Sequence, residues 1–160
     1  MMKSKIDRYE ELLPEILSVV EGETDAIANM ANVASMLHEA FGFWWTGFYR
    51  VLQPQDAHEE LLVLGPFQGP LACTRIKKGR GVCGTAWAEM RTVVVPNVHD
   101  FPGHIACSSL SNSEIVVPMI KDGKMVAELD IDSKEFNTFD EVDARFLEEV
   151  CRYVTENSAW

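Results

Sequence analysis

The sequence feature that most constrains the fold is a pair of strand-like segments joined by a tight turn. Apolar residues alternate with other residues over 114–120 and again over 124–132. The dipeptide Asp122-Gly123 lies between them, and Asp-Gly favours the short turn of a β-hairpin. Such a hairpin needs a partner for its apolar face. We therefore predict an antiparallel sheet whose one face is buried against other elements.

The length of the hairpin loop determines which residues face each other. A two-residue loop would pair Ile115 with Asp130 and mix apolar and acidic side chains on one face. A three-residue loop over 121–123 would pair Ile115 with Leu129 and make one face consistently apolar. Because a shift of one residue moves every side chain to the other face, we predict the three-residue loop.

The opposite face of this predicted hairpin is acidic. Glu114 would lie opposite Asp130, and Glu128 and Asp132 would share that face because side chains alternate along a strand. Like charges that face each other destabilise a hairpin. One interpretation is a solvated acidic face. The other is a site for an ammonium group or a hard metal ion, in which crowding raises the pKa of at least one carboxyl group so that it can donate a proton.

The remaining segments alternate between helical and strand patterns. Amphipathic periodicity predicts helices over residues 3–20, 23–42 and 139–160, and a short helix over 81–90. Strand-like composition predicts further strands over residues 43–52, 59–67, 71–78 and 92–97. We predict an α+β fold in one domain spanning residues 1–160. Its central antiparallel sheet should carry the terminal helices packed together on one face.

Composition excludes several classes of function. A chain of 160 residues is long enough to bury a core, and its apolar runs are too short to span a membrane. The N-terminal segment has no signal-peptide pattern, so we expect a cytoplasmic protein. The net charge of −11 argues against nucleic acid and anionic membranes as partners, because both require a basic surface.

The four cysteines show no metal-binding spacing. Cys73, Cys83, Cys107 and Cys151 form neither a C-x-x-C pair nor a zinc-finger pattern, so we expect no structural zinc site. Cys107 lies in a long polar loop over 97–113, where serine hydroxyls and backbone groups can stabilise a thiolate. Cys151 lies on the apolar face of the last helix, where we expect it to be buried.

A glycine-rich segment surrounds Cys83. Gly79, Gly81 and Gly84 form a G-x-G-x-x-G pattern, which occurs in dinucleotide-binding turns. The preceding residues 71–78 lack the continuous apolar run of a buried parallel strand, which argues against a nucleotide site. We therefore interpret the glycines as a tight turn that begins a helix. At that helix N-terminus we expect a lowered pKa for the Cys83 thiol.

Three motifs resemble one known family. The segments GRGVCGTAW, HIACSSLSNSEIVVP and AELDIDS, together with the order of helices and strands, are similar to GAF domains. The cysteine spacings resemble the branch formed by the free methionine-(R)-sulfoxide reductases. The resemblance implies a homodimer that reduces the free amino acid rather than methionine sulfoxide within proteins.

The resemblance also implies a role for each matched residue. Cys107 would be the nucleophile, Cys83 the resolving cysteine and Cys73 an auxiliary resolving cysteine. The remaining matches would bind the substrate, either through carboxylates that also assist proton delivery or through aromatic rings that line the pocket: Glu114, Asp130, Asp132, Trp45 and Tyr49.

The implied reaction is a cysteine redox cycle. The Cys107 thiolate would attack the sulfoxide sulfur and become a sulfenic acid, which a second cysteine would convert to a disulfide. Thioredoxin would reduce that disulfide, and no metal or organic cofactor would be required. Two alternatives stay open at this point: a non-catalytic GAF sensor of a small ligand, and a redox switch without turnover.

Overall fold

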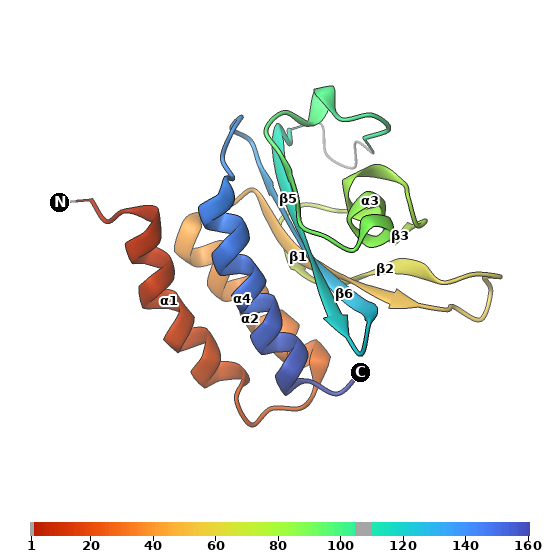
Figure 1. The fold of residues 1–160 in the computed structure, drawn as a ribbon, viewed down its shortest axis with the longest axis horizontal. Coiled ribbons are helices and arrows are strands. Elements are labelled where there is room, and N and C mark those ends of the chain that lie inside the picture. Colours follow the sequence, from red (N-terminus) through yellow and green to blue (C-terminus); the bar gives the residue numbers. More distant parts are fainter. Residues whose placement is uncertain (1, 105–109) are drawn as a thin grey trace.

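The fold is built on one six-stranded antiparallel sheet (Figure 1). The computed structural model describes residues 2–104 and 110–160. The strands follow one another across the sheet in the order β3-β2-β1-β6-β5-β4. Their bounds are β1 Trp45–Leu52, β2 Leu61–Gln68, β3 Arg75–Ile76, β4 Val93–Val95, β5 Ser113–Lys121 and β6 Lys124–Ser133. This confirms the predicted α+β class with a central antiparallel sheet.

Three helices lie on one side of the sheet, the first of them packed against the other two, and the fourth lies on the opposite side (Figure 1). The first group is α1 Lys5–Val20, α2 Ala26–Phe41 and α4 Glu141–Asn157; the other face carries α3 Gly81–Glu89. A 3-10 turn over Val98–Asp100 follows β4. The predicted packing of the terminal helices together on one face is therefore correct. No helix in the described part of the chain combines the length and apolarity that a membrane span requires.

Local sequence signals determine where the long helices begin and end. Ser4 caps α1 and Asp140 caps α4, each through a reciprocal capping box. Asp25 caps α2 by accepting a hydrogen bond from the backbone N–H of Ala28. α2 ends at Gly42, whose φ of 67° is the left-handed conformation that glycine adopts without strain.

The central hairpin has the predicted faces but a different register. The loop contains two residues, Asp122 and Gly123, both with positive φ, as a tight hairpin turn requires. A bulge then occurs between Met119 and Ile120, where β6 contains one extra residue, Val126. The predicted three-residue loop is therefore wrong.

The bulge restores the apolar face that a two-residue loop alone would disrupt. Ile115 faces Ile131 rather than Leu129, and Glu114 faces Asp132 rather than Asp130. Ile115, Ile131 and Leu129 all join the core beneath the three helices. The carboxylates consequently share the opposite face, as predicted. The pairing between the strands, however, is shifted by two residues along β6 from the predicted pairing.

The segment over residues 71–78 is a much shorter strand than predicted. Only Arg75 and Ile76 pair with β2. Trp45 of β1 donates a hydrogen bond from Nε1 to the carbonyl oxygen of Pro70 (3.0 Å), and Tyr49 donates one from its hydroxyl to the carbonyl oxygen of Cys73 (2.9 Å). These side-chain bonds hold the segment over the sheet face instead of along the sheet edge.

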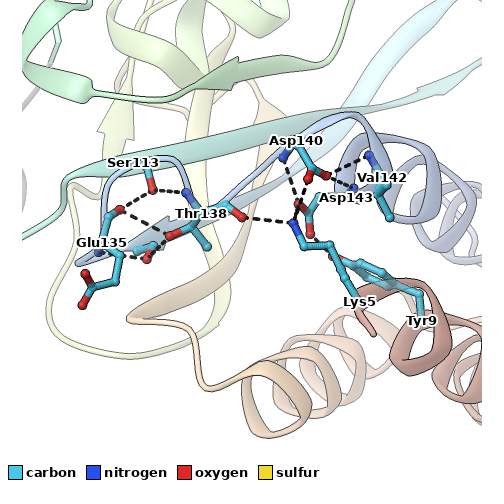
Figure 2. Close-up of polar contacts among 9 residues, drawn as sticks. Lys5, Tyr9, Ser113, Glu135, Thr138, Asp140, Val142 and Asp143 are labelled. Carbon is cyan, nitrogen blue, oxygen red and sulfur yellow. Dashed lines mark hydrogen bonds and ion pairs between the residues drawn. The ribbon is translucent and has the colours of Figure 1, made fainter. Parts of the chain in front are cut away.

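A buried carboxylate joins the first and last helices (Figure 2). Asp143 of α4 is 2% exposed and accepts a hydrogen bond from the Tyr9 hydroxyl (2.6 Å). The Lys5 ammonium group lies 2.6 Å from the same carboxylate. Asp143 also accepts a hydrogen bond from the backbone N–H of Asp140, which completes the cap of α4. One side chain therefore fixes both the start of α4 and its contact with α1.

We predict that Asp143→Ala lowers the free energy of unfolding by about 3 kcal/mol, because it leaves Lys5 and Tyr9 without their shared acceptor. Tyr9→Phe keeps the ring and should cost about 1 kcal/mol. Lys3 and Glu11 form an ion pair of the same 2.6 Å length, but both side chains are more than half exposed. Glu11→Ala should therefore change stability by less than about 1 kcal/mol. Urea unfolding measures all three, and equal losses for Asp143→Ala and Glu11→Ala would contradict this account.

Candidate active site

A pocket lies between α3 and the face of the sheet opposite the three packed helices. Strands β1, β5 and β6 form its floor, and α3 forms one wall. The segment before β3 and the segment after β4 complete the lining. The polar or aromatic lining side chains in these elements are Trp45, Tyr49, Arg80, Cys83, His104, Ser111, Glu114, Asp130 and Asp132.

Strand alternation brings the predicted carboxylates together in this pocket. Glu114 lies directly opposite Asp132 in the β5–β6 pair, and Asp130 lies two residues from Asp132 on the same face. Glu114 and Asp130 are each 5% exposed, whereas Asp132 is partly exposed. Ser111 donates a hydrogen bond from Oγ to Oδ1 of Asp132 at 3.1 Å.

Burial and mutual repulsion favour the protonated forms of these groups. Burial raises the pKa of Glu114 well above its usual range, and the charges of Asp130 and Asp132 raise this pKa further. Burial is also the main cause of the raised pKa of Asp130 and of Asp132. The pocket can thus hold a carboxylic acid that is able to donate a proton.

Cationic side chains compensate little of this acidic charge. In residues 2–104 and 110–160, the ion pairs include no lysine or arginine bound to Glu114, Asp130 or Asp132. His104 Nε2 lies 3.8 Å from Glu114 Oε1, but burial lowers the pKa of His104 and favours its neutral form. Oδ1 of Asp130 is buried and has no hydrogen-bond partner among the described groups. The pocket is therefore complementary to a cation.

Two aromatic side chains, those of Trp45 and Tyr49, line one side of the pocket. Their rings are stacked with centroids 6.1 Å apart, and the Phe67 ring is stacked with Trp45 at 5.3 Å. Gly47 lies between Trp45 and Tyr49 on β1, and a Cβ atom on Gly47 would collide with the Trp45 ring. The absence of a side chain at Gly47 therefore leaves room for the indole ring.

The glycine-rich segment positions Cys83. Gly79 has a positive φ, and its N–H donates a hydrogen bond to the carbonyl oxygen of Gly84 at 2.8 Å. A Cβ atom on Gly84 would lie 2.5 Å from the carbonyl oxygen of Lys77. The glycines thus allow the loop to pack closely against the first turn of α3, which carries Cys83 into the pocket.

The predicted lowering of the Cys83 pKa is wrong. The side chain is buried, and its Sγ lies 4.0 Å from Oε2 of Glu114. Burial raises the pKa of the Cys83 thiol well above its usual range, and the charges of Asp130, Glu128 and Glu114 add to the rise. These unfavourable effects on the thiolate outweigh the helix N-terminus.

The other cysteines differ in accessibility. Cys73 is half-buried and disulfide-bonded. Cys151 lies on the buried face of α4, as predicted, and is a free thiol in the core. Cys107, the predicted nucleophile, belongs to residues 105–109 and therefore lies outside the described residues.

The structure adds residues to the site that the sequence interpretation did not include. His104 enters from the segment after β4, and Arg80 lies at the N-terminus of α3. The position of His104, three residues before Cys107, is a sequence signal that could have indicated the pocket. Arg80 carries no comparable signal, because its placement depends on the fold of the glycine turn.

One group of side chains could also hold a metal ion. The ligand atoms of Cys83, Glu114 and Asp130 all lie within 4.8 Å of one another, and all three residues are buried. No other such group occurs among the described residues. The arrangement can therefore bind either an ammonium group or a metal ion, next to an aromatic surface.

Comparisons with known proteins agree with this architecture. Residues 25–156 match the GAF domain family. GAF domain-containing protein A of Dictyostelium discoideum is 55% identical over 149 residues, which cover 93% of this chain and 91% of that protein. The free methionine-R-sulfoxide reductase of Saccharomyces cerevisiae is 40% identical over 158 residues, covering 92% and 86%.

A solved structure gives the same result. The X-ray structure of free methionine-R-sulfoxide reductase from Neisseria meningitidis, in complex with its substrate, has a TM-score of 0.92 and 54% sequence identity to this chain. The alignment covers 98% of this chain and 92% of that one. The protein therefore belongs to the GAF domain family. Its relatives within that family include free methionine-R-sulfoxide reductases, which confirms the resemblance drawn from the three motifs.

We predict that the pocket carboxyls make stability depend on pH. A group whose pKa is raised by folding stabilises the protein fully below its unfolded-state pKa, and this stabilisation is lost as the pH rises through the folded-state value. In urea unfolding between about pH 5 and about pH 8, Asp130→Asn should therefore lose less stability than the wild type. Asp122→Asn, which changes an exposed carboxylate of the same hairpin, is the control and should follow the wild type. Parallel curves for Asp130→Asn and the wild type would contradict the prediction.

Proposed function

We propose that this protein reduces free methionine-(R)-sulfoxide to methionine in the pocket between α3 and the sheet. The observation that carries the proposal is the buried acidic cluster of Glu114, Asp130 and Asp132, which lies beside an aromatic surface. A free amino acid has an ammonium group, whereas a methionine sulfoxide residue within a protein does not. The relatives named as free methionine-R-sulfoxide reductases support the same conclusion.

Charge complementarity suggests how the substrate would bind. Its ammonium group would lie against Glu114, Asp130 and Asp132, where it offsets their repulsion. Its carboxylate would lie toward Arg80, at the N-terminal end of α3, where the guanidinium group and the helix dipole favour an anion. The methyl and methylene groups would contact the apolar surface of Trp45 and Tyr49.

The first chemical step would transfer the sulfoxide oxygen to a cysteine. The Cys107 thiolate attacks the sulfoxide sulfur while a carboxylic acid of the cluster protonates the sulfoxide oxygen. The attack forms a bond between the two sulfur atoms. The protonated oxygen then passes to the Cys107 sulfur as the substrate sulfur–oxygen bond and the new sulfur–sulfur bond break, so methionine leaves with the electron pair and Cys107 becomes a sulfenic acid. The raised pKa of Glu114 suits it to this proton transfer at neutral pH.

The second step would form a disulfide and release water. A second cysteine attacks the sulfenic acid sulfur, and the oxygen leaves as water. The sequence suggested Cys83 for this role and Cys73 as an auxiliary thiol. Two features of the structure favour exchanging these roles: Cys83 is buried among carboxylates that raise its pKa, whereas Cys73 is half-buried and disulfide-bonded.

The cycle would close by reduction of that disulfide. We propose thioredoxin as the reductant, because a dithiol of this class exchanges with a protein disulfide and restores both thiols. The chemistry draws only on thiols and carboxyl groups, so it requires no organic cofactor and no catalytic metal. The homodimer implied by the family resemblance stays a prediction.

Turnover with the natural type of reductant tests the proposal. The reduced protein with thioredoxin, thioredoxin reductase and NADPH should consume NADPH when free methionine-(R)-sulfoxide is added, and the (S) form should give little consumption. Cys107→Ser should abolish the reaction, whereas Cys151→Ser should retain it. Substrate binding without turnover by the reduced wild type would instead indicate a sensor.

Serine variants of Cys73 and Cys83 distinguish these two thiols in a single turnover without reductant. Cys73→Ser should release methionine once but form no intramolecular disulfide, because the resolving thiol is absent. Cys83→Ser should still form the disulfide. Mass spectrometry of alkylated protein measures both products, and the reverse pattern would restore the resolving role to Cys83.

We predict that Asp130→Asn lowers kcat/KM by at least about tenfold, which corresponds to about 1.4 kcal/mol. The change removes a negative charge that would face the substrate ammonium group. It also removes a charge that raises the pKa of Glu114. Asp122→Asn keeps the same hairpin and lies outside the pocket, so its kcat/KM should be unchanged. An unaltered kcat/KM for Asp130→Asn in steady-state assays would exclude this carboxylate from the site.

A further inference from the structure

Three potential ligands converge at the innermost part of the pocket from three different elements. Cys83 comes from the first turn of α3, Glu114 from β5 and Asp130 from β6. Their sulfur and oxygen ligand atoms lie within 4.8 Å of one another. Since each side chain is buried and attached to a regular element, the three donors are already close before any ligand binds.

A separate observation indicates that this cluster lacks a positively charged partner. Oδ1 of Asp130 is buried and, in the part of the chain that the structure describes, accepts no hydrogen bond. Both carboxylate oxygens of Glu128, two residues earlier on β6, are also buried without a hydrogen-bond partner among the described groups. Buried carboxylates without donors are costly, and a cation is the ligand that relieves this cost most directly.

The donor set selects among cations. Mg²⁺ and Ca²⁺ prefer six or more oxygen ligands, whereas this cluster offers one sulfur and two carboxylates. Zn²⁺ accepts thiolate, carboxylate and imidazole ligands in fourfold coordination. His104 Nε2 lies 3.8 Å from Glu114 Oε1 but is not part of this group of three, so water would be the fourth ligand.

We propose that Cys83, Glu114 and Asp130 bind a zinc-class divalent ion, and that the bound ion excludes the amino-acid substrate from the pocket. Binding forms a metal–sulfur bond and releases the Cys83 thiol proton to solvent. The ion occupies the carboxylates that would otherwise hold the substrate ammonium group. This second part rests on the proposed function, whereas the metal site itself does not.

The site would act as an inhibitory site rather than a cofactor site. An ion bound by two of the three substrate carboxylates places a positive charge where the substrate also carries one. It also ties up a carboxyl group proposed to donate the proton. Cys83 would then be the residue that couples this thiol enzyme to metal availability, a role distinct from disulfide formation.

Zinc binding to the reduced protein is the first measurement. The metal-free full-length protein, kept reduced with a phosphine, is titrated with Zn²⁺ by isothermal titration calorimetry. We expect binding at one site per chain, with Cys83→Ser and Asp130→Asn each weakening it by at least about tenfold. Cys151→Ser changes a buried thiol outside the pocket and should bind as the wild type does. Mg²⁺ should produce no binding signal.

One further variant guards against a different zinc site. The double change Cys73→Ser and Cys107→Ser removes the thiols proposed for catalysis and should leave zinc affinity within about twofold of the wild type. Loss of binding in that variant, or unchanged binding in both Cys83→Ser and Asp130→Asn, would overturn the proposal. Circular dichroism confirms that each variant is folded before it is titrated.

Competition tests the link with the substrate. Free methionine-(R)-sulfoxide should weaken apparent zinc binding to the double cysteine variant, which cannot consume it, and methionine sulfoxide within a blocked peptide should not. Zinc should raise the apparent KM of the wild type without lowering kcat. Zinc binding that is unaffected by the substrate would overturn the inhibitory role. Zinc binding in a protein that shows no turnover would refute the proposed function alone.

Discussion

The structure depends on a repulsive pairing at the centre of its sheet. Glu114 and Asp132 face each other across β5 and β6, with Asp130 on the same face, and the burial of Glu114 and Asp130 limits the screening of charge by water. Such a pairing destabilises a hairpin in isolation. It persists because the other face of the same strands is continuously apolar and packs beneath three helices. The core on one face therefore offsets the cost of the site on the other.

The floor of the site and its covering differ in structure: the floor consists of paired strands, whereas much of the covering is irregular. The carboxylates lie on central strands, and Asp143 fixes α4 to α1 behind them. In contrast, the pocket is covered by the short helix α3 and by segments with little regular structure. Hydrogen bonds from Trp45 and Tyr49 to backbone carbonyl groups hold one of these segments in place. The carboxylates therefore lie on regular structure, whereas an irregular covering segment is held by side-chain hydrogen bonds.

The sequence predicted the faces of the hairpin better than its register. Alternation alone places Ile115 in the core and Glu114 on the opposite face of the sheet, and both placements are correct. The pairing itself depends on the bulge at Val126, and no local pattern in the sequence announces that extra residue. The sequence did not predict His104 and Arg80 as pocket residues for a related reason. Their positions are set by tertiary contacts of loops, whereas periodicity describes only strands and helices.

Cys83 shows why local sequence and tertiary environment can support opposite conclusions. A thiol at a helix N-terminus is expected to ionise easily, and the glycine turn before α3 does place Cys83 there. The same turn, however, brings the thiol beside Glu114 and into a buried acidic cluster, which opposes a second negative charge. A buried thiol in that setting is a weak nucleophile until a cation offsets the surrounding charge. Within this segment, therefore, the Cys83 side chain faces an acidic environment that favours a cation, whereas Arg80 at the helix N-terminus is suited to an anion.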